Sequence, residues 1–195
     1  MDTKIAHETV DNLFKELDLT AESVSVKLEK LMAVDARYIK DLKINVSNVL
    51  SSKNLNKKES YLLGFATAVN EKNLALQESF EKLALREGAT DAEIAEVISA
   101  VSLMNVNNVF YRFRHFMDNE FYTQAPAGIK MSIMLNPVTG KEFFELLSLM
   151  LSALNGCEMC VRSHEESVKS HGASRERIFD AVKLGSVIKG LITVL

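Results

Sequence analysis

The chain has 195 residues, a length that fits one domain or two small halves sharing a core. Its formal net charge of -3 gives no basic surface of the kind that binds nucleic acid, and no Lys/Arg run points to an anionic membrane. The first residues lack the apolar segment of a secretory signal, and the longest nearly apolar stretch, 146–154, is too short to span a bilayer. We therefore expect a cytoplasmic protein with no nucleic-acid or membrane partner.

Hydrophobic residues recur at helical spacing along the chain, whereas β-branched alternation is scarce. Residues 10–17 carry apolar side chains at positions i, i+3, i+4 and i+7, and residues 94–101 repeat this spacing. One loop-rich region, at about residues 122–140, contains both prolines. The pattern predicts a single all-α domain over residues 1–195. Its last segment, 178–195, is apolar enough to serve as an oligomer interface.

A faint internal repeat connects the two halves of the chain. Gly88-Ala89-Thr90 and the apolar series after it recur 84 residues later, beginning at Gly172-Ala173-Ser174. In the first half Thr90 also forms a capping-box pattern with Glu93. In the second, Gly172 and Ser174 fit the end of one helix and the N-cap of the next. Chance similarity between glycine-capped helical hairpins is the alternative explanation.

Upstream, residues 68–70 resemble residues 153–155 at an offset of 85. This offset aligns Lys72 and approximately Ala75 with the two cysteines of the second half. We predict a duplicated helical unit, with a degenerate N-terminal copy at about 35–120 and a C-terminal copy at about 140–195. Only the C-terminal copy can then carry thiol chemistry.

The two cysteines of the chain, Cys157 and Cys160, stand three residues apart, and His164 follows four residues after the second. On a helix these three side chains share one face. In a reducing compartment a lone close pair is more often catalytic, redox-active or metal-binding than structural. The spacing therefore favours sulfur redox chemistry or metal binding.

Zinc is the metal that this ligand set would suit, since Cys157, Cys160 and His164 could supply three ligands. A structural zinc site needs a fourth ligand, usually Cys or His. No further cysteine exists, and His171 fits better as a cation at a helix C-terminus. We expect no metal, and a zinc site is the alternative.

Residues 143–151 are apolar nearly all round, which is typical of a buried helix. Glu145 lies inside this segment, and burial disfavours its charged form unless the carboxylate is paired. Glu145 is therefore either functional or a first-turn partner of the helix dipole. The helix should end at Asn155-Gly156, so that Cys157 falls in the first turn of the next helix, where a thiolate is favoured.

These residues fit an activated nucleophile. His164 can accept a thiol proton or return it to a leaving alkoxide, and Glu145 can orient His164. A thiolate attacks a peroxide oxygen or a disulfide sulfur. A thiol oxidised by a peroxide becomes a sulfenic acid, with which the neighbouring thiol condenses.

At this point the chain resembles the AhpD-type alkylhydroperoxidases of the carboxymuconolactone-decarboxylase-like superfamily. The resemblance covers about residues 35–192. It includes the mid-chain stretch 107–112, Asn136-Pro137 and the pattern Glu-x11-Cys-x2-Cys-x3-His from Glu145 to His164. One position differs, because well-known members have a histidine directly before the second cysteine, where this chain has Met159. This difference can alter thiol acidity, rate or reductant.

The resemblance implies an all-α fold of duplicated units, commonly assembled as a homotrimer, that reduces organic hydroperoxides and supports a partner peroxiredoxin. It implies no bound cofactor, with electrons supplied by a dihydrolipoamide-type dithiol on a lipoyl-bearing protein. It also implies that Cys160 reacts with the peroxide, that Cys157 closes the disulfide and is more open to exchange, and that His164 and Glu145 form a proton relay.

Two other functions remain open from the sequence. Fold-level kinship allows a decarboxylase-like enzyme acting on a small organic acid, although decarboxylation has no need of two thiols. The third possibility is a non-enzymatic, redox-responsive interaction protein whose disulfide switches an oligomer.

Overall fold

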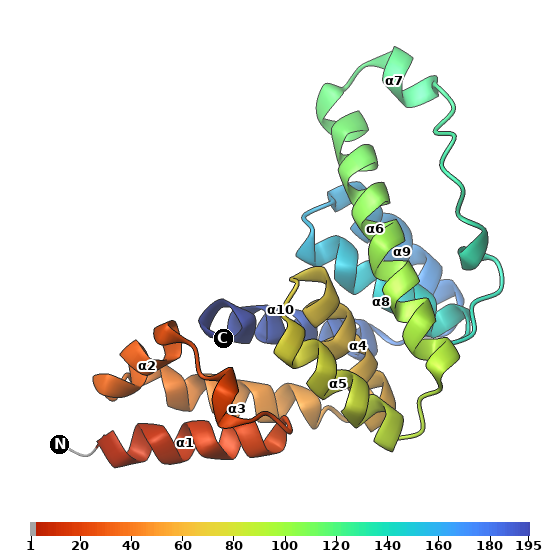
Figure 1. Ribbon diagram of the computed structural model, residues 1–195. Helices are drawn as coiled ribbons and strands as arrows, with labels where there is room; N and C mark the ends of the chain where they lie inside the picture. The colour runs from red at the N-terminus through yellow and green to blue at the C-terminus, as the bar shows by residue number, and fades with distance from the viewer. Residues whose placement is uncertain (1–2) are drawn as a thin grey trace.

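The computed structural model describes residues 3–195, and over this range the chain forms ten α-helices, two short 3-10 helices and no strand (Figure 1). The all-α class predicted from the sequence is confirmed. None of the described helices combines the length and the apolar character needed to cross a membrane. In chain order the elements are α1 (Thr3–Glu16), η1 (Ala21–Ser23), α2 (Val26–Ala33), α3 (Tyr38–Leu50), α4 (Lys57–Asn70), α5 (Leu74–Arg86), α6 (Asp91–Met117), α7 (Glu120–Gln124), η2 (Ser132–Met134), α8 (Lys141–Leu154), α9 (Glu158–Ser170) and α10 (Arg175–Val194).

The helices begin at capping residues that the sequence makes recognisable. Thr90 caps α6 in a capping box with Glu93, as predicted, and Asn56 caps α4 in the same way with Glu59. Ser174 caps α10, also as predicted. These side chains accept hydrogen bonds from backbone N–H groups that the first turn of a helix leaves without partners.

The second half of the chain repeats the helix boundaries of the first half. α8, α9 and α10 each begin 84 residues after α4, α5 and α6, respectively. The turns before α5 and α9 correspond as well, since Lys72 and Gly156 both have left-handed backbones, with φ of 61° and 69°. An offset of 84 aligns Cys157 with Asn73 and Cys160 with Leu76. This corrects the sequence-based alignment of the cysteines with Lys72 and Ala75.

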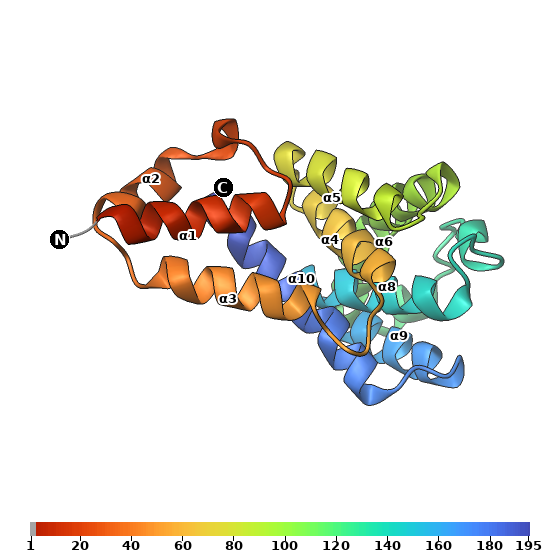
Figure 2. The same cartoon turned by 90° about the horizontal axis from the view of Figure 1, so that it is seen from below.

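α10 crosses α4 and α8 at the centre of the molecule (Figures 1 and 2). Gly185 permits this close approach, because a Cβ atom there would lie 2.8 Å from the side chain of Met150. The C-terminal helix thus contributes one apolar face to the chain's own core. The buried residues of α10 are Ala181, Leu184, Gly185, Ile188 and Leu191.

The N-terminal helices α1, α2 and α3 lie beside the end of α10 (Figure 2). The predicted apolar stripe at residues 10–17 is buried, and α1 packs against α2 and α3. Ser25 caps α2 and also donates its hydroxyl to the carbonyl of Val194 at 2.6 Å. These contacts fix the C-terminal end of α10.

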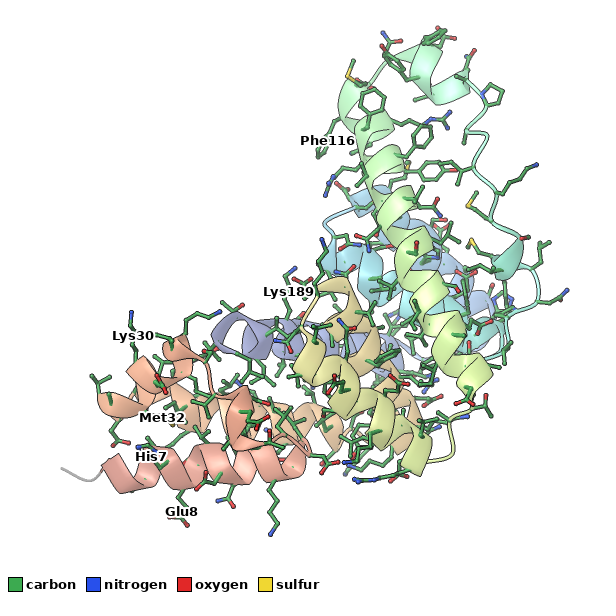
Figure 3. The ribbon with its side chains drawn as sticks, in the orientation of Figure 1. His7, Glu8, Lys30, Met32, Phe116 and Lys189 are labelled. Atoms are coloured by element: carbon green, nitrogen blue, oxygen red, sulfur yellow. A yellow bond between two sulfur atoms is a disulfide. The ribbon has the colours of Figure 1, made fainter. Side chains whose placement is uncertain are left out.

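α6 is the longest helix, and its second half runs out beyond the packed body to α7 (Figure 1). The region 122–140 then returns to α8 with only a few helical residues, as the loop prediction stated. Ile98 is 47% exposed, so the predicted apolar face of residues 94–101 is narrower than expected. Phe116 stands near the far end of α6, away from the body (Figure 3).

Candidate active site

The cysteine motif occupies the turn between α8 and α9. Asn155 is the C-cap of α8, Gly156 adopts the left-handed conformation that glycine favours, and Cys157 is the N-cap of α9. The Sγ of Cys157 accepts a hydrogen bond from the backbone N–H of Cys160 at 3.4 Å. Cys157 thus lies one position before the first turn in which the sequence placed it, and both cysteines lie at the positive end of the α9 dipole.

Cys157 and Cys160 are joined by a disulfide, with their Cα atoms 5.3 Å apart. Cys157 is 0% exposed, while Cys160 is 7% exposed and lines a cavity. In this disulfide form Cys157 is thus the more deeply buried of the two cysteines. A molecule in the cavity therefore meets the sulfur of Cys160.

Glu145 and His164 face each other across the α8–α9 hairpin. The Nδ1 atom of His164 lies 2.7 Å from Oε2 of Glu145, and both side chains are buried. Burial raises the pKa of Glu145, but the hydrogen bond and charge of His164, followed by those of Lys141, outweigh this effect and hold the pKa below its ordinary value. Because an ionised carboxylate can only accept, Nδ1 carries the proton and Nε2 is left to exchange one.

The cavity beside Cys160 has a volume of about 340 Å³. Its wall is largely apolar, and thioethers and an aromatic ring contribute most of that character. Cys160 and His164 both line it, so a bound molecule lies beside both residues. The cavity is lined by Asn107, Tyr111, Met131, Met134, Met159, Cys160, Ser163 and His164.

Hydrogen bonds from neighbouring helices hold the turn that carries the cysteines. The side-chain amide of Asn155 donates to Oδ1 of Asn108 at 2.9 Å and accepts from the amide of Asn70 at 3.0 Å. The guanidinium of Arg112 donates to the carbonyl oxygen of Asn155 at 2.5 Å. α4 and α6 thus fix the end of α8, and with it the position of Cys157.

The structure brings together Glu145, His164 and Cys160 as the sequence pattern anticipated. It also adds residues for which the sequence analysis gave no role, chiefly Asn107 and the cavity-lining methionines. A signal for Asn107 was present, since two adjacent asparagines, 107 and 108, occupy core-facing positions of an otherwise apolar helical stripe. No periodic pattern marks the loop that carries Met131 and Met134 as part of the site.

Neither His171 nor His115 belongs to this site. His171 is the C-cap of α9, and its Nδ1 lies 2.8 Å from the carbonyl of Ser167. His115 is an exposed residue of α6 that lies 3.9 Å from a carboxylate oxygen of Glu158. Over residues 5–195 the side chains form no group of three or more His, Cys, Asp or Glu that could hold a metal ion.

Comparison with known proteins gives consistent matches. The sequence model of the carboxymuconolactone decarboxylase family matches residues 122–194. The chain is 35% identical to the alkyl hydroperoxide reductase AhpD of Solibacter usitatus, covering 87% of this chain and 96% of that protein. It is 35% identical to AhpD of Rhodococcus erythropolis, over 85% and 92% of the two chains, and 36% identical to AhpD of Rhizorhabdus wittichii, over 80% and 90%.

Among solved structures, the fold is similar to that of a gamma-carboxymuconolactone decarboxylase subunit from Burkholderia xenovorans. The TM-score is 0.67 at 14% sequence identity, and the match covers 100% of this chain and 93% of that one. At this low sequence identity, the match shows that the two proteins share a fold and shows nothing about their activities.

Proposed function

This chain belongs to the AhpD family of alkyl hydroperoxide reductases, which are peroxidases, and we propose that Cys160, Cys157, His164 and Glu145 carry out its reaction. The observation that supports this most strongly is the bond between Glu145 and His164, 2.7 Å long, beside a cavity that Cys160 lines. A carboxylate, an imidazole and a thiol in this order form an activated nucleophile with an oriented base.

In the first half of the proposed cycle, Nε2 of His164 accepts the proton of the Cys160 thiol. The thiolate sulfur then bonds to the terminal oxygen of the hydroperoxide, and the O–O bond breaks with its electron pair leaving on the alkoxide. The sulfur loses two electrons and becomes a sulfenic acid, and the peroxide gains them. The proton held by His164 passes to the alkoxide, and an alcohol leaves.

In the second half, the Cys157 thiol attacks the sulfenic sulfur, water leaves and the Cys157–Cys160 disulfide forms. A dihydrolipoamide-type dithiol on a lipoyl-bearing protein reduces this disulfide by thiol–disulfide exchange. The reduced pair can transfer its electrons by the same exchange to an oxidised peroxiredoxin. Such a cycle needs a reducing compartment, so we place the protein in the cytoplasm.

A coupled assay with dihydrolipoamide and cumene hydroperoxide tests this function. Cys160→Ser should lose turnover while its helical circular dichroism stays normal. In the absence of dihydrolipoamide, reduced Cys157→Ser should consume one equivalent of hydroperoxide and keep Cys160 as a sulfenic acid that dimedone traps, because no second thiol can close the disulfide. Normal turnover in Cys160→Ser would refute the proposed mechanism.

We also propose that α4–α6 and α8–α10 are copies of one unit and that only the second copy carries the site. The offset of 84 residues places Tyr61 where the second copy has Glu145, and Phe80 where it has His164. The rings of Tyr61 and Phe80 are in contact, with centroids 6.4 Å apart. The interhelical contact is thus apolar in one copy and ionic in the other. An experimental structure in which these pairs fail to superimpose would contradict the duplication.

Finally, we propose that the chain forms a homo-oligomer, a trimer by its kinship, through the outer half of α6. Large apolar side chains are exposed there, and patches of this kind mark interaction sites. Phe116→Glu should therefore yield a smaller species in analytical ultracentrifugation, and an unchanged mass would contradict this interface. The exposed side chains are Val106, Val109, Phe113 and Phe116.

A further inference from the structure

Asn107 is a buried polar residue in the wall of the cavity that Cys160 and His164 share. It lies on α6 and is only 5% exposed. Its amide nitrogen donates to the sulfur of Met131 at 3.3 Å, and a thioether is a weak acceptor. Its Oδ1 has no hydrogen-bond partner among the described residues.

A buried oxygen without a donor is uncommon, because desolvating it has a cost that no hydrogen bond offsets. The mechanism above gives Asn107 no part. Its neighbour Asn108 behaves differently, since Oδ1 of Asn108 accepts from Asn155 at 2.9 Å and its amide donates to Ser152 at 2.9 Å. Of these two adjacent asparagines, the one in the cavity wall is the one with a free acceptor.

The chemistry of the cavity indicates which donor would pair with this oxygen. Met131, Met134 and Met159 offer an apolar surface, which suits the alkyl part of a molecule. An alkyl hydroperoxide carries a single hydrogen-bond donor, the O–H of its terminal oxygen. That terminal oxygen is also the atom that a thiolate attacks.

We propose that Asn107 is a substrate-binding residue whose Oδ1 accepts the O–H of the hydroperoxide and holds the terminal oxygen beside Cys160. This inference rests on the proposed peroxidase function. The hydrogen bond persists through the reaction, because the hydrogen stays on the terminal oxygen when that oxygen becomes the sulfenic hydroxyl. Only the O–O bond breaks, and the alkoxide leaves with its electron pair to take the proton of His164.

The test compares two electrophiles in the Cys157→Ser background, where Cys160 is the sole thiol. Cumene hydroperoxide carries an O–H donor, and sulfenic acid formed from it is trapped with dimedone. Methyl methanethiosulfonate has no N–H or O–H donor and reports the reactivity of the thiolate alone. The ratio of the two second-order rate constants isolates recognition of the O–H group from thiol acidity and from folding.

Asn107→Leu should lower the hydroperoxide rate constant about tenfold, the fold-change that one hydrogen bond is worth, and leave the methanethiosulfonate rate nearly unchanged. Asn107→Asp keeps an acceptor oxygen, so its negative charge should slow both reactions and preserve their ratio. Asn48→Leu makes the same side-chain change at an exposed position of α3 and should alter neither rate. Should Asn107→Leu fail to fold, Asn107→Ala removes the same acceptor with less bulk.

An unchanged ratio in Asn107→Leu or Asn107→Ala would overturn the role of Asn107 while leaving the proposed function intact. A lowered ratio in Asn107→Asp equal to that in Asn107→Leu would overturn it as well, because an acceptor would then be irrelevant. If the protein with native Asn107 formed no sulfenic acid at all, the proposed function would be refuted, and so would this inference.

Discussion

Lys141 lies one helical turn before Glu145 on α8, with its Nζ 3.2 Å from Oε1 of the carboxylate. The same ammonium group donates to the carbonyl oxygen of Met134 at 2.5 Å. Lys141 therefore connects the buried carboxylate, whose other oxygen holds His164, with the loop that covers the cavity.

Replacing Lys141 by methionine should move the acidic limb of the peroxidase pH profile to higher pH. Burial raises the pKa of Glu145, and His164 and Lys141 lower it. Without Lys141 the carboxylate takes up a proton at a higher pH, and the neutral carboxyl group then holds His164 by a weaker, uncharged hydrogen bond. Steady-state rates between pH 4 and 8 measure this shift. Lys169→Met, which breaks an exposed pair with Glu165, is the control, and an identical shift in it would contradict the argument.

The stability of the protein should depend on pH through Glu145. Its pKa in the folded state is lower than the ordinary value of 4.5, so the ionised form stabilises the fold at neutral pH, and this contribution disappears as the pH falls through the folded-state value. Glu145→Gln should be less stable than the native protein by about 1–3 kcal/mol at pH 7. The difference should shrink below the ordinary pKa. Urea unfolding at pH 7 and pH 3.5 checks this, and a constant difference would contradict it.

Arg177 should be a major contributor to the stability of the helical core. From α10 its guanidinium pairs with Glu59 of α4 at 2.6 Å and with Glu142 of α8 at 2.8 Å. Burial raises the pKa of Glu59, but Arg177, together with the backbone N–H of Asn56 and the charge of Lys58, outweighs this effect and lowers the pKa. Arg177→Met leaves two half-buried carboxylates unpaired and should cost about 3 kcal/mol. Arg162→Met, at an exposed pair, should cost less than about 1 kcal/mol, so equal melting temperatures of the two variants would refute the claim.

Two helical glycines should respond differently to alanine. A Cβ atom at Gly64 would lie 2.7 Å from the ring of Phe80, while one at Gly185 would lie 2.8 Å from the side chain of Met150. An aromatic ring in a packed core cannot yield, whereas a methionine can change its rotamer. Gly64→Ala should therefore destabilise the protein by about 1–3 kcal/mol, despite alanine's better helix propensity. Gly185→Ala should cost clearly less, and the reverse order in thermal unfolding would contradict this account.

Much of the fold follows from local signals in the sequence. The apolar stripe at 10–17, the capping box at Thr90 and the turn at Gly172 each appear where the sequence places them, because helix periodicity and end residues act over a few positions. The Glu145–His164 pairing also follows, since a buried carboxylate needs a partner and His164 lies on the next helix.

Long-range packing accounts for what could not be predicted. The apolar residues of α10 are equally compatible with a subunit interface. Their burial, together with the close approach of Gly185 to Met150, shows that they fill this chain's core. Met131 and Met134 reach the site through an irregular loop, where no periodicity applies. The free acceptor of Asn107 depends on which neighbours fold around it, and that information is absent from any short stretch of sequence.

The proposed oxidation of Cys157 and Cys160 by a hydroperoxide is tested most directly by the mass and the thiol content of the fully reduced protein after one equivalent of cumene hydroperoxide. We predict the loss of two hydrogen atoms per chain, the release of one equivalent of alcohol and a Cys157–Cys160 bond within the same chain in peptide mapping. Reduced protein that retains both free thiols under these conditions would contradict the claim.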